Sequence, residues 1–294
     1  MNLVNNPYLV ENEQAYQSWR NQKLADYPRN VNELVVTLQG ASVSGAEVQK
    51  LRSVIAKTNV AIYRLPDKHD IDKSFVRELG QKLGLNRLDG NLCADDDSIT
   101  SLQVVEDGRH SGYIPYTSRR LSWHTDGYYN PLNEQIRAIV MHCARPAASG
   151  GENLLLDQEI AYIQLRDENP NYIKALMNPD VMLIPPNIEN GEEIRGAQSG
   201  PVFSLDANTD SLHMRYTART RNIEWASDSV TKQAVAFINE LLTPDNPYVF
   251  THRLNAGEGI ICNNVLHNRS AFEDDVDHKR LLYRARYYDR VANT

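Results

Sequence analysis

The sequence predicts a mainly β protein with flanking helices, built on a double-stranded β-helix, or jelly roll. Three observations support this fold class. Short β-prone segments recur between residues 59 and 287, the few helix-prone segments lie early and mid-chain, and no internal repeat or linker interrupts the 294 residues. We therefore expect one domain over residues 1–294, with a helical amino-terminal elaboration at 1–58 and the jelly-roll core at about 60–288.

The amino-terminal part shows helical patterning. Residues 13–23 favour a short helix. Ser44 is a suitable N-cap because Glu47 follows three residues later, which is the spacing of a capping box, and hydrophobic residues then recur at helical spacing. A further helix is expected over residues 72–83, ending at Gly84, since glycine is preferred just past helix ends.

The β segments follow one another through the rest of the chain. Turn-forming residues at 148–151 and 206–210 each join two neighbouring segments, the second as a hairpin. The expected strands are residues 59–63, 99–105, 136–143, 153–156, 181–184, 202–205, 212–216, 248–254, 259–263 and 281–287. A late helix, with Asp228 as its N-cap, is expected to bury Val230, Ala234, Phe237, Ile238 and Leu241.

An insertion near residues 157–200 interrupts the core. It begins with a helix at 158–168, which Pro170 is expected to stop, and a second helix near 172–177. A polar loop over residues 185–200 completes it.

Composition excludes several classes of protein. Hydrophobic residues make up 41% and charged residues 23%, which is ordinary for a globular protein. No run approaches the roughly 18 apolar residues of a membrane span, and no signal peptide is expected. Cys93, Cys143 and Cys262 form no C-x-x-C pair, which favours a reducing cytoplasm. The net charge of −7 without a basic patch disfavours nucleic acid, so we expect a small-molecule substrate, and a homo-oligomer is allowed.

The segment around His124 is the strongest candidate for chemistry. In a strand, His124 and Asp126 point to one face while Trp123 and Thr125 point to the other. With His267 from a distant strand they would form a 2-His-1-carboxylate facial triad, the ligand set of non-haem Fe(II) oxygenases, at the mouth of the jelly roll. The other histidines are expected to be structural within strands (His142, His213 and His252) or solvated (His69, His110 and His278).

The last strand carries alternating arginines. Arg280, Leu282, Arg284 and Arg286 share one face, and the opposite face is hydrophobic. Two interpretations stay open. The arginines either protect an exposed edge strand or point into the barrel, where an unpaired charge requires an anion.

A set of polar and aromatic residues near His124 could bind the substrate. Arg120 and Tyr128 have the strand parity of His124, and with Tyr113 and Tyr129 they offer a cation and aromatic faces for a carboxylate-bearing or ammonium-bearing molecule. The alternative is that the tyrosines only pack a loop. Residues 108–119, which precede the motif, form a candidate lid.

The order of these motifs resembles the taurine dioxygenase and 2,4-D dioxygenase (TauD/TfdA) superfamily of Fe(II)/2-oxoglutarate enzymes, over residues 60–288. A middle segment is also similar to the γ-butyrobetaine hydroxylase branch, although that branch's zinc module has no counterpart here. The motifs that carry the resemblance are His124-x-Asp126, Gly150-Gly151-Glu152-Asn153, Gly257-Glu258-Gly259, Asn264, His267, Arg280 and Arg284.

The resemblance implies a single catalytic domain that uses Fe(II), 2-oxoglutarate and O2 to hydroxylate a small charged organic molecule, with release of succinate and CO2. His124, Asp126 and His267 would bind iron, Arg280 the distal carboxylate of 2-oxoglutarate, and Asn153 and Arg284 would lie close to the cosubstrate. The retained Asp126 disfavours halogenation. Two alternatives remain, a non-catalytic cupin-like metal-binding module and a zinc hydrolase that uses the same triad. A buried Arg280 would favour the dioxygenase.

Overall fold

The computed structural model describes residues 6–66, 71–90, 95, 97–105, 113–207, 209–219, 221 and 223–294. His69, Cys93, His110 and the start of the candidate lid lie outside these residues. The chain divides into two compact units. The helical unit comprises Met1–Tyr27, Trp123–Gln135 and Leu156–Val249, and the sheet unit comprises Pro28–Ser122, Ile136–Leu155 and Phe250–Thr294. The single catalytic domain stays a prediction.

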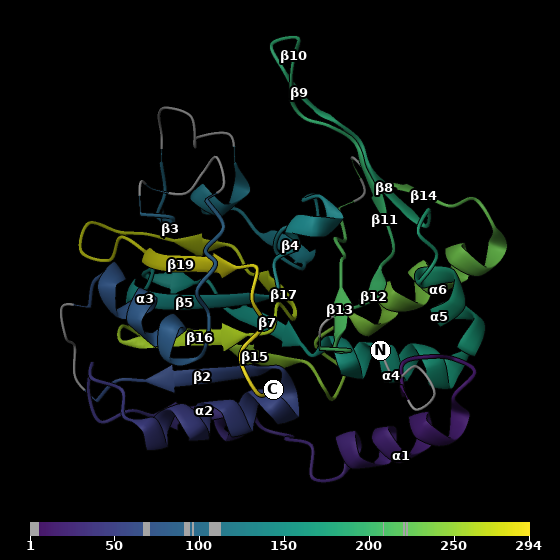
Figure 1. Cartoon of the computed structure of the whole chain (residues 1–294). Helices are drawn as coiled ribbons and strands as arrows, with labels where there is room; N and C mark the ends of the chain where they lie inside the picture. The colour runs from purple at the N-terminus through teal and green to yellow at the C-terminus, as the bar shows by residue number, and fades with distance from the viewer. Residues whose placement is uncertain are drawn as a thin grey trace. The chain divides into compact units, whose positions relative to one another are not determined.

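The sheet unit is built on a six-stranded large sheet with the order β1-β2-β16-β5-β19-β3 (Figure 1). Neighbouring strands in this sheet are antiparallel, except that β1 and β2 are parallel. Its strands are β1 (Val35–Thr37), β2 (Val60–Arg64), β3 (Ile99–Leu102), β5 (Ala138–Arg145), β16 (Glu258–Cys262) and β19 (Leu281–Tyr287).

A second, small sheet has the order β15-β7-β17-β4. Strands β15, β16, β17 and β19 alternate between the small and the large sheet, as strands do in a double-stranded β-helix. The strands are β4 (Leu121–His124), β7 (Asn153–Leu156), β15 (Phe250–His252) and β17 (Leu266–Arg269), beside the short pair β6 (Ser149–Gly150) and β18 (Phe272–Glu273). Strand β17, which carries His267, was missing from the expected strands.

Two helices lie against the large sheet, as Figure 1 shows. They are α2 (Gly45–Thr58) and α3 (Lys73–Lys82). Ser44 forms the expected capping box with Glu47, and Asp72 caps α3. The hydrophobic faces of both helices join the sheet in one core cluster. The described residues also form the short 3-10 helices η2 (Val31–Leu34), η3 (Ile114–Tyr116) and η4 (Leu132–Glu134).

The helical unit contains α1 (Glu13–Leu24), α4 (Gln158–Glu168), α5 (Pro170–Leu176) and α6 (Ser229–Leu241). The prediction that Pro170 stops a helix was incomplete, because Pro170 is also the first residue of α5, a position where its missing N–H costs nothing. Asp228 caps α6 as expected, but Val230 and Phe237 are only half-buried.

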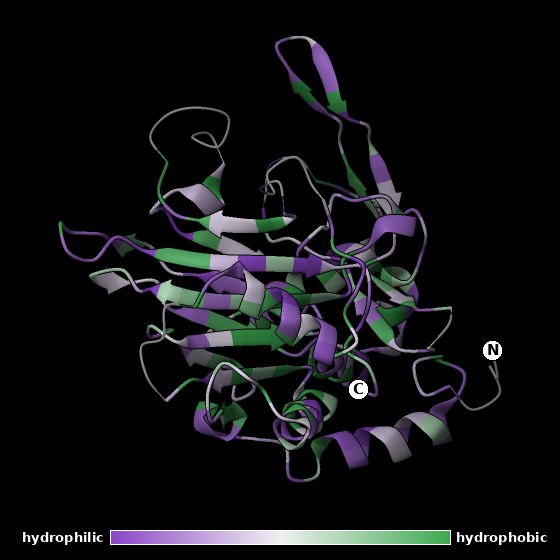
Figure 2. Cartoon of the chain, turned by 60° about the vertical axis from the view of Figure 1, so that its left-hand side comes forward, coloured by the Kyte–Doolittle hydropathy of each residue, from purple (hydrophilic) through white to green (hydrophobic). Residues whose placement is uncertain are grey.

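The prediction of a polar loop over residues 185–200 is wrong. The residues form a hairpin of β9 (Asn187–Glu189) and β10 (Glu192–Arg195), then β11 (Gln198–Gly200), which pairs with β8 (Met182–Ile184). The hairpin projects from β8 and β11 in Figure 1 and is largely hydrophilic in Figure 2, which explains why hydrophobic periodicity did not reveal it. The other strands are β12 (Phe203–Leu205), β13 (Leu212–Met214) and β14 (Glu224–Trp225); β12 and β13 form the expected hairpin.

The arginine face of β19 points inward. Strand β19 lies between β5 and β3, so the edge-strand interpretation is wrong. Arg280, Arg284 and Arg286 are 5%, 9% and 3% exposed, while Ala285 and Tyr287 belong to the core on the opposite face. Among the described residues, no helix is long and apolar enough to span a bilayer.

Candidate active site

His124 and Asp126 form a buried pair in the helical unit. His124 is the last residue of β4, and its Nε2 lies 3.3 Å from Asp126 Oδ1. The two residues are 7% and 5% exposed. As the alternation predicts, their side chains converge on one side of the chain. A ring nitrogen and a carboxylate oxygen this close together, away from solvent, are suited to bind one cation.

The backbone of this pair is fixed by the segment that follows β13. The Thr125 N–H donates to the Tyr216 carbonyl over 2.9 Å, and the Tyr216 N–H donates back to Thr125 Oγ1 over 3.1 Å. An isolated bridge joins His124 to Thr217. Because these bonds hold the main chain on both sides of His124, the imidazole and the carboxylate start from a defined orientation.

Two tyrosines follow the pair after a turn at Gly127, whose φ is +68°. The Tyr128 ring lies 6.4 Å from the His124 ring, edge to face, and the Tyr129 ring lies 5.1 Å from that of Tyr128. Arg215 Nε donates to the Tyr128 carbonyl over 2.7 Å. Two of the four candidate substrate residues are therefore beside His124.

The other two candidates lie in the sheet unit. Arg120 is exposed and comes before the first residue of β4, and Tyr113 is half-buried ahead of η3. Because Arg120 lies outside the strand, the parity argument does not extend to it. Their assignments stay predictions.

His267 lies in the middle of β17, where all residues are buried. Its Nδ1 is 2.9 Å from the Val265 carbonyl oxygen. A carbonyl only accepts, so Nδ1 carries the proton and Nε2 has the lone pair. The preceding turn depends on Asn264, which has a φ of +52° and donates from Nδ2 to the Ile136 carbonyl over 2.7 Å. Such a hydrogen bond on the other ring nitrogen is what orients metal-binding histidines.

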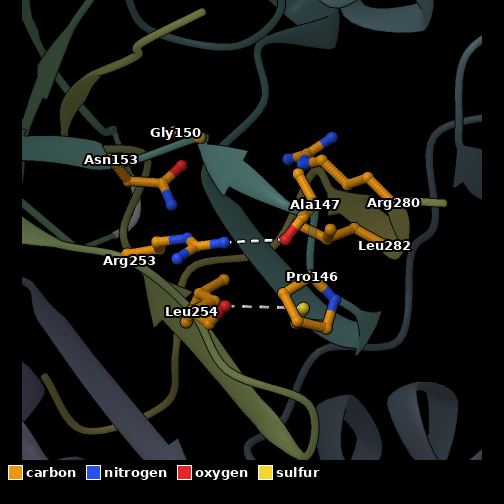
Figure 3. A pocket seen from close by; sticks show the side chains of 10 residues that line it. Pro146, Ala147, Gly150, Asn153, Arg253, Leu254, Arg280 and Leu282 are labelled. Carbon is orange, nitrogen blue, oxygen red and sulfur yellow. Dashed lines mark hydrogen bonds between the residues drawn. The ribbon is translucent and has the colours of Figure 1, made fainter. Parts of the chain in front are cut away.

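A pocket in the sheet unit contains Arg280 (Figure 3). Its Nη1 is buried and has no hydrogen-bond partner within the described residues, and the guanidinium lies 5.0 Å from the centre of the Phe272 ring. Burial lowers the pKa of Arg280 to about 10, with the Cys143 thiol and Asp274 acting in the opposite direction. The side chain therefore lacks the carboxylate that a buried arginine requires.

Asn153, another predicted cosubstrate residue, lines the same pocket from β7. Figure 3 shows its amide and the Arg280 guanidinium on different sides of the cavity. The turn before it is tight, as predicted, and specific to glycine. Gly150 has a φ of +69°, and a Cβ there would lie 2.2 Å from the Ala271 carbonyl oxygen. The pocket is thus shaped by the Gly150-Gly151 turn.

Arg269 is a residue that the sequence reasoning missed. It is 4% exposed, and Nη2 donates to the Thr117 carbonyl over 2.8 Å. Burial, then the charges of Arg280 and Arg284, lower its pKa to about 9. The charges of Arg280 and Arg284 thus act on Arg269, and no carboxylate forms an ion pair with Arg269 or Arg280 among the described residues. The available signal was parity, since Arg269 shares a face with His267.

The histidines expected to be structural are so. His142 lies 2.9 Å from the Tyr63 hydroxyl, and burial lowers its pKa to about 4. His252 contacts Glu258 over 3.0 Å, and Arg64 completes that ion-pair group. His213 is buried on β13, while His278 is exposed beside Asp275.

A jelly-roll fold, a buried His-x-Asp pair and a buried arginine facing a pocket without a carboxylate define a non-haem iron oxygenase of the 2-oxoglutarate type. The chain belongs to the Taurine catabolism dioxygenase TauD, TfdA family, whose profile matches residues 31–286. It is an Fe(II)/2-oxoglutarate-dependent dioxygenase, an oxidoreductase that acts on a small molecule with O2. This favours the dioxygenase over the metal-binding module and the zinc hydrolase.

Among curated proteins, the chain is similar to two uridine-5'-phosphate dioxygenases. The one from Amycolatopsis sp is 30% identical over 192 residues, 63% of this chain and 67% of that protein. The one from Streptomyces sp is 27% identical over 201 residues, 66% of this chain and 71% of that protein. The similarity to the γ-butyrobetaine branch stays a prediction.

Solved structures confirm the fold. Asparagine oxygenase in complex with Fe(II), 2S,3S-3-hydroxyasparagine and succinate aligns with a TM-score of 0.58 at 17% identity, covering 83% of this chain and 78% of that one. AAD-2 in complex with Mn(II) and N-oxalylglycine aligns with a TM-score of 0.61 at 13% identity, covering 88% and 97%. At these identities the likeness establishes the jelly-roll fold alone.

Proposed function

We propose that His124, Asp126 and His267 hold the iron. The donor set fits Fe(II), since two imidazole nitrogens and one carboxylate leave positions open for cosubstrate and O2. Three features support the assignment. His124 and Asp126 are a buried pair 3.3 Å apart, His267 has its Nε2 lone pair set by the Val265 carbonyl, and β17 neighbours β4 in the order of the small sheet.

Arg280 is the proposed partner of the distal carboxylate of 2-oxoglutarate. The observation that carries this function is its buried Nη1, which has no partner among the described residues and faces a pocket also lined by Asn153. A guanidinium and a carboxylate form two parallel hydrogen bonds, so the cosubstrate would supply the missing anion. Arg284, on the same face of β19, is the proposed second cation near the cosubstrate, and its neighbour Arg269 adds to the positive field.

When bound, the iron would supply the oxidation of 2-oxoglutarate to succinate and CO2 coupled to insertion of oxygen into a substrate C–H bond. The residues of the chain have the tasks of binding and orientation. Val265 holds the His267 ring, Thr125 and Tyr216 hold the segment of the His124 pair, and Tyr128 places an apolar face beside His124. Such packing limits the access of water to the reacting groups.

The proposed substrate is a small anionic molecule of the nucleoside monophosphate class. The two curated relatives are named for uridine 5'-phosphate, and the Tyr128 and Tyr129 rings beside His124 can pack against a planar ring. This proposal keeps the expected small charged molecule but replaces the expected carboxylate or ammonium group with a phosphate. An aromatic cage for an ammonium group has less support, because the neighbouring charge in this part of the unit is the cation Arg195, 5.9 Å from the Tyr129 ring.

The test is substrate-dependent formation of succinate. The purified protein is incubated with Fe(II), ascorbate, 2-oxoglutarate and a panel that includes uridine 5'-phosphate, other nucleotides, amino acids and sulfonates. We expect succinate above background, abolished in Asp126→Ala and retained in His278→Ala, which removes an exposed histidine outside the site. Equal succinate from the parent protein and Asp126→Ala across the panel would remove the support for this function.

A cytoplasmic location is also proposed, on the ground that Cys143 is a free thiol buried in the sheet unit. Burial raises the pKa of Cys143 to about 12, so this thiol is protonated and unreactive. Localisation of a tagged full chain in its native host would test the proposal, and recovery from an extracytoplasmic fraction would contradict it.

A further inference from the structure

Arg195 lies beside the tyrosines that follow the His124 pair, although the sequence reasoning placed it in a polar loop. It is the last residue of β10, and its guanidinium lies 5.9 Å from the centre of the Tyr129 ring. The Tyr129 ring is 5.1 Å from that of Tyr128, which is 6.4 Å from the His124 ring. Three aromatic rings and one cation thus form a continuous row within the helical unit.

A β-bulge turns Arg195 toward this row. In the hairpin Glu193 pairs with Ile188, but Arg195 pairs with Asn187, so β10 has one extra residue between the two pairs. An extra residue reverses the alternation of side chains, and such bulges re-aim side chains next to functional sites. Arg195 therefore does not share the face it would share with Glu193 in a regular strand.

The charge of Arg195 is not neutralised within the described residues. Nη1 donates to the Gly196 carbonyl over 2.7 Å and Nη2 to the Pro185 carbonyl over 2.8 Å, which orients the guanidinium and leaves further N–H groups for a ligand. No carboxylate forms an ion pair with it there, and the charge of Glu193 is the weakest influence on its pKa, after burial and the two tyrosines.

A second arginine strengthens the positive field. Arg215 is 2% exposed, and it donates hydrogen bonds to four main-chain carbonyls, those of Tyr128, Met182, Gln198 and Gly200. Burial and then the charge of Arg195 lower the pKa of Arg215 to about 10. Two cations that repel each other beside Tyr128 and Tyr129 favour the binding of an anion.

We propose that Arg195 binds the anionic group of the substrate. The ring or apolar part of the substrate would pack against Tyr128 and Tyr129, beside His124. The inference rests on the proposed function, because it assigns the substrate-recognition part of the same site. The anionic group is a phosphate or similar oxyanion, to which a guanidinium donates paired hydrogen bonds. The hairpin β9–β10 would then be an element of substrate specificity.

The test compares uridine 5'-phosphate with uridine, which lacks the phosphate. Their dissociation constants are measured by calorimetry without O2, using the full chain loaded with Fe(II) and 2-oxoglutarate. The parent protein should bind uridine 5'-phosphate at least about ten-fold more tightly than uridine, as one charge-assisted pair provides. Arg195→Met should weaken binding of uridine 5'-phosphate about ten-fold or more and leave uridine unchanged, and Arg195→Lys should restore part of the loss.

Arg20→Met is the matched control, because it removes an arginine of the same unit that pairs with Asp167 on the surface. It should leave both dissociation constants unchanged. Equal weakening of both ligands by Arg195→Met, no weakening, or no preference of the parent protein for the phosphate would each overturn the assignment. The proposed function is scored separately by substrate-dependent succinate formation, which Asp126→Ala should abolish and Arg20→Met should retain. If the parent protein forms succinate but Arg195→Met binds uridine 5'-phosphate as the parent does, only the assignment of Arg195 fails.

Discussion

Replacement of Arg280 by methionine should have opposite effects on stability and on cosubstrate binding. Arg280 is 5% exposed, its Nη1 has no partner among the described residues, and burial lowers its pKa to about 10. Because the folded pKa lies below the unfolded value, folding disfavours the charged form. This penalty is present in full below pH 10 and is relieved as the pH rises above 10 toward the pKa of the unfolded chain.

The magnitude follows from this shift. Each pKa unit corresponds to about 1.4 kcal/mol, so the buried charge costs the ligand-free protein roughly 3 kcal/mol. Methionine has a similar length and no charge. Arg280→Met should therefore raise the free energy of unfolding by about 1–3 kcal/mol without 2-oxoglutarate, in line with replacements of buried charges by hydrophobic residues.

The same change should weaken the binding of 2-oxoglutarate. A hydrogen bond to a charged group contributes about 1.5–3 kcal/mol, so the dissociation constant should rise about 10-fold to 150-fold. The assay is chemical unfolding with and without 2-oxoglutarate, combined with calorimetry of 2-oxoglutarate on the Fe(II)-loaded protein without O2. 2-Oxoglutarate should stabilise the parent protein and have little effect on Arg280→Met.

Arg286→Met is the matched control on the same strand. Arg286 is 3% exposed and is paired with the buried Asp89. Its removal leaves a buried carboxylate unpaired and should lower stability by about 3–5 kcal/mol, while the affinity for 2-oxoglutarate stays the same. If Arg280→Met is destabilised like Arg286→Met, or binds 2-oxoglutarate as the parent does, Arg280 is a structural residue and the reasoning is refuted.

Three further predictions follow from the contacts. Gly150→Ala should lower the free energy of unfolding by about 2 kcal/mol or more and raise the KM for 2-oxoglutarate. The control is Gly191→Ala, also at positive φ, where an added Cβ would have no atom within 4 Å. It should lower the free energy of unfolding by only about 1 kcal/mol and leave KM unchanged. Arg215→Lys should lower kcat/KM, because lysine cannot bridge the carbonyls that Arg215 binds, including that of Tyr128. Arg166, a buried arginine that binds carbonyls of the amino-terminal segment, provides the control. An equal loss in Arg166→Lys would contradict the prediction. Although desolvation raises the pKa of Glu258, hydrogen bonds from His252, Asn255 and Arg64 lower it to about 2. The parent protein should therefore lose stability as the pH falls from about 4.5 to 2, and Glu258→Gln should lose less. Parallel acid unfolding curves for the two proteins would contradict the shift.

Sequence reasoning succeeded where local chemistry decides structure. The capping box at Ser44, the N-cap at Asp228 and the alternation of β19 are short-range patterns, and each appears in the structure. It failed where context decides. The face of β19 had two interpretations, and only the neighbouring strands β5 and β3 show that Arg280 points inward.

The residues of the candidate site could also be predicted only in part. The pairing of His124 and Asp126 follows from strand alternation, because they lie on one strand and in the turn after it. The proximity of Arg280 and Asn153 was implied by the resemblance to the dioxygenase family. Arg195 could not be found from periodicity, because a bulge reverses its direction and the hairpin that carries it is polar on both strands. Arg269 could have been found, since it shares a face with His267.

Both units contain arginines that repel one another or lack an ion-pair partner among the described residues. In the sheet unit, Arg280 faces a pocket with no carboxylate for its Nη1, and Arg269 is influenced by two further arginines. In the helical unit, Arg195 and Arg215 repel each other beside the tyrosines. The chain as a whole has a net charge of −7, so these cations are local features that a general excess of basic residues does not explain. Two anions, a dicarboxylic cosubstrate and an anionic substrate, would neutralise them. Each unit should therefore gain stability from a different ligand, which thermal unfolding with 2-oxoglutarate alone, uridine 5'-phosphate alone and both together can measure.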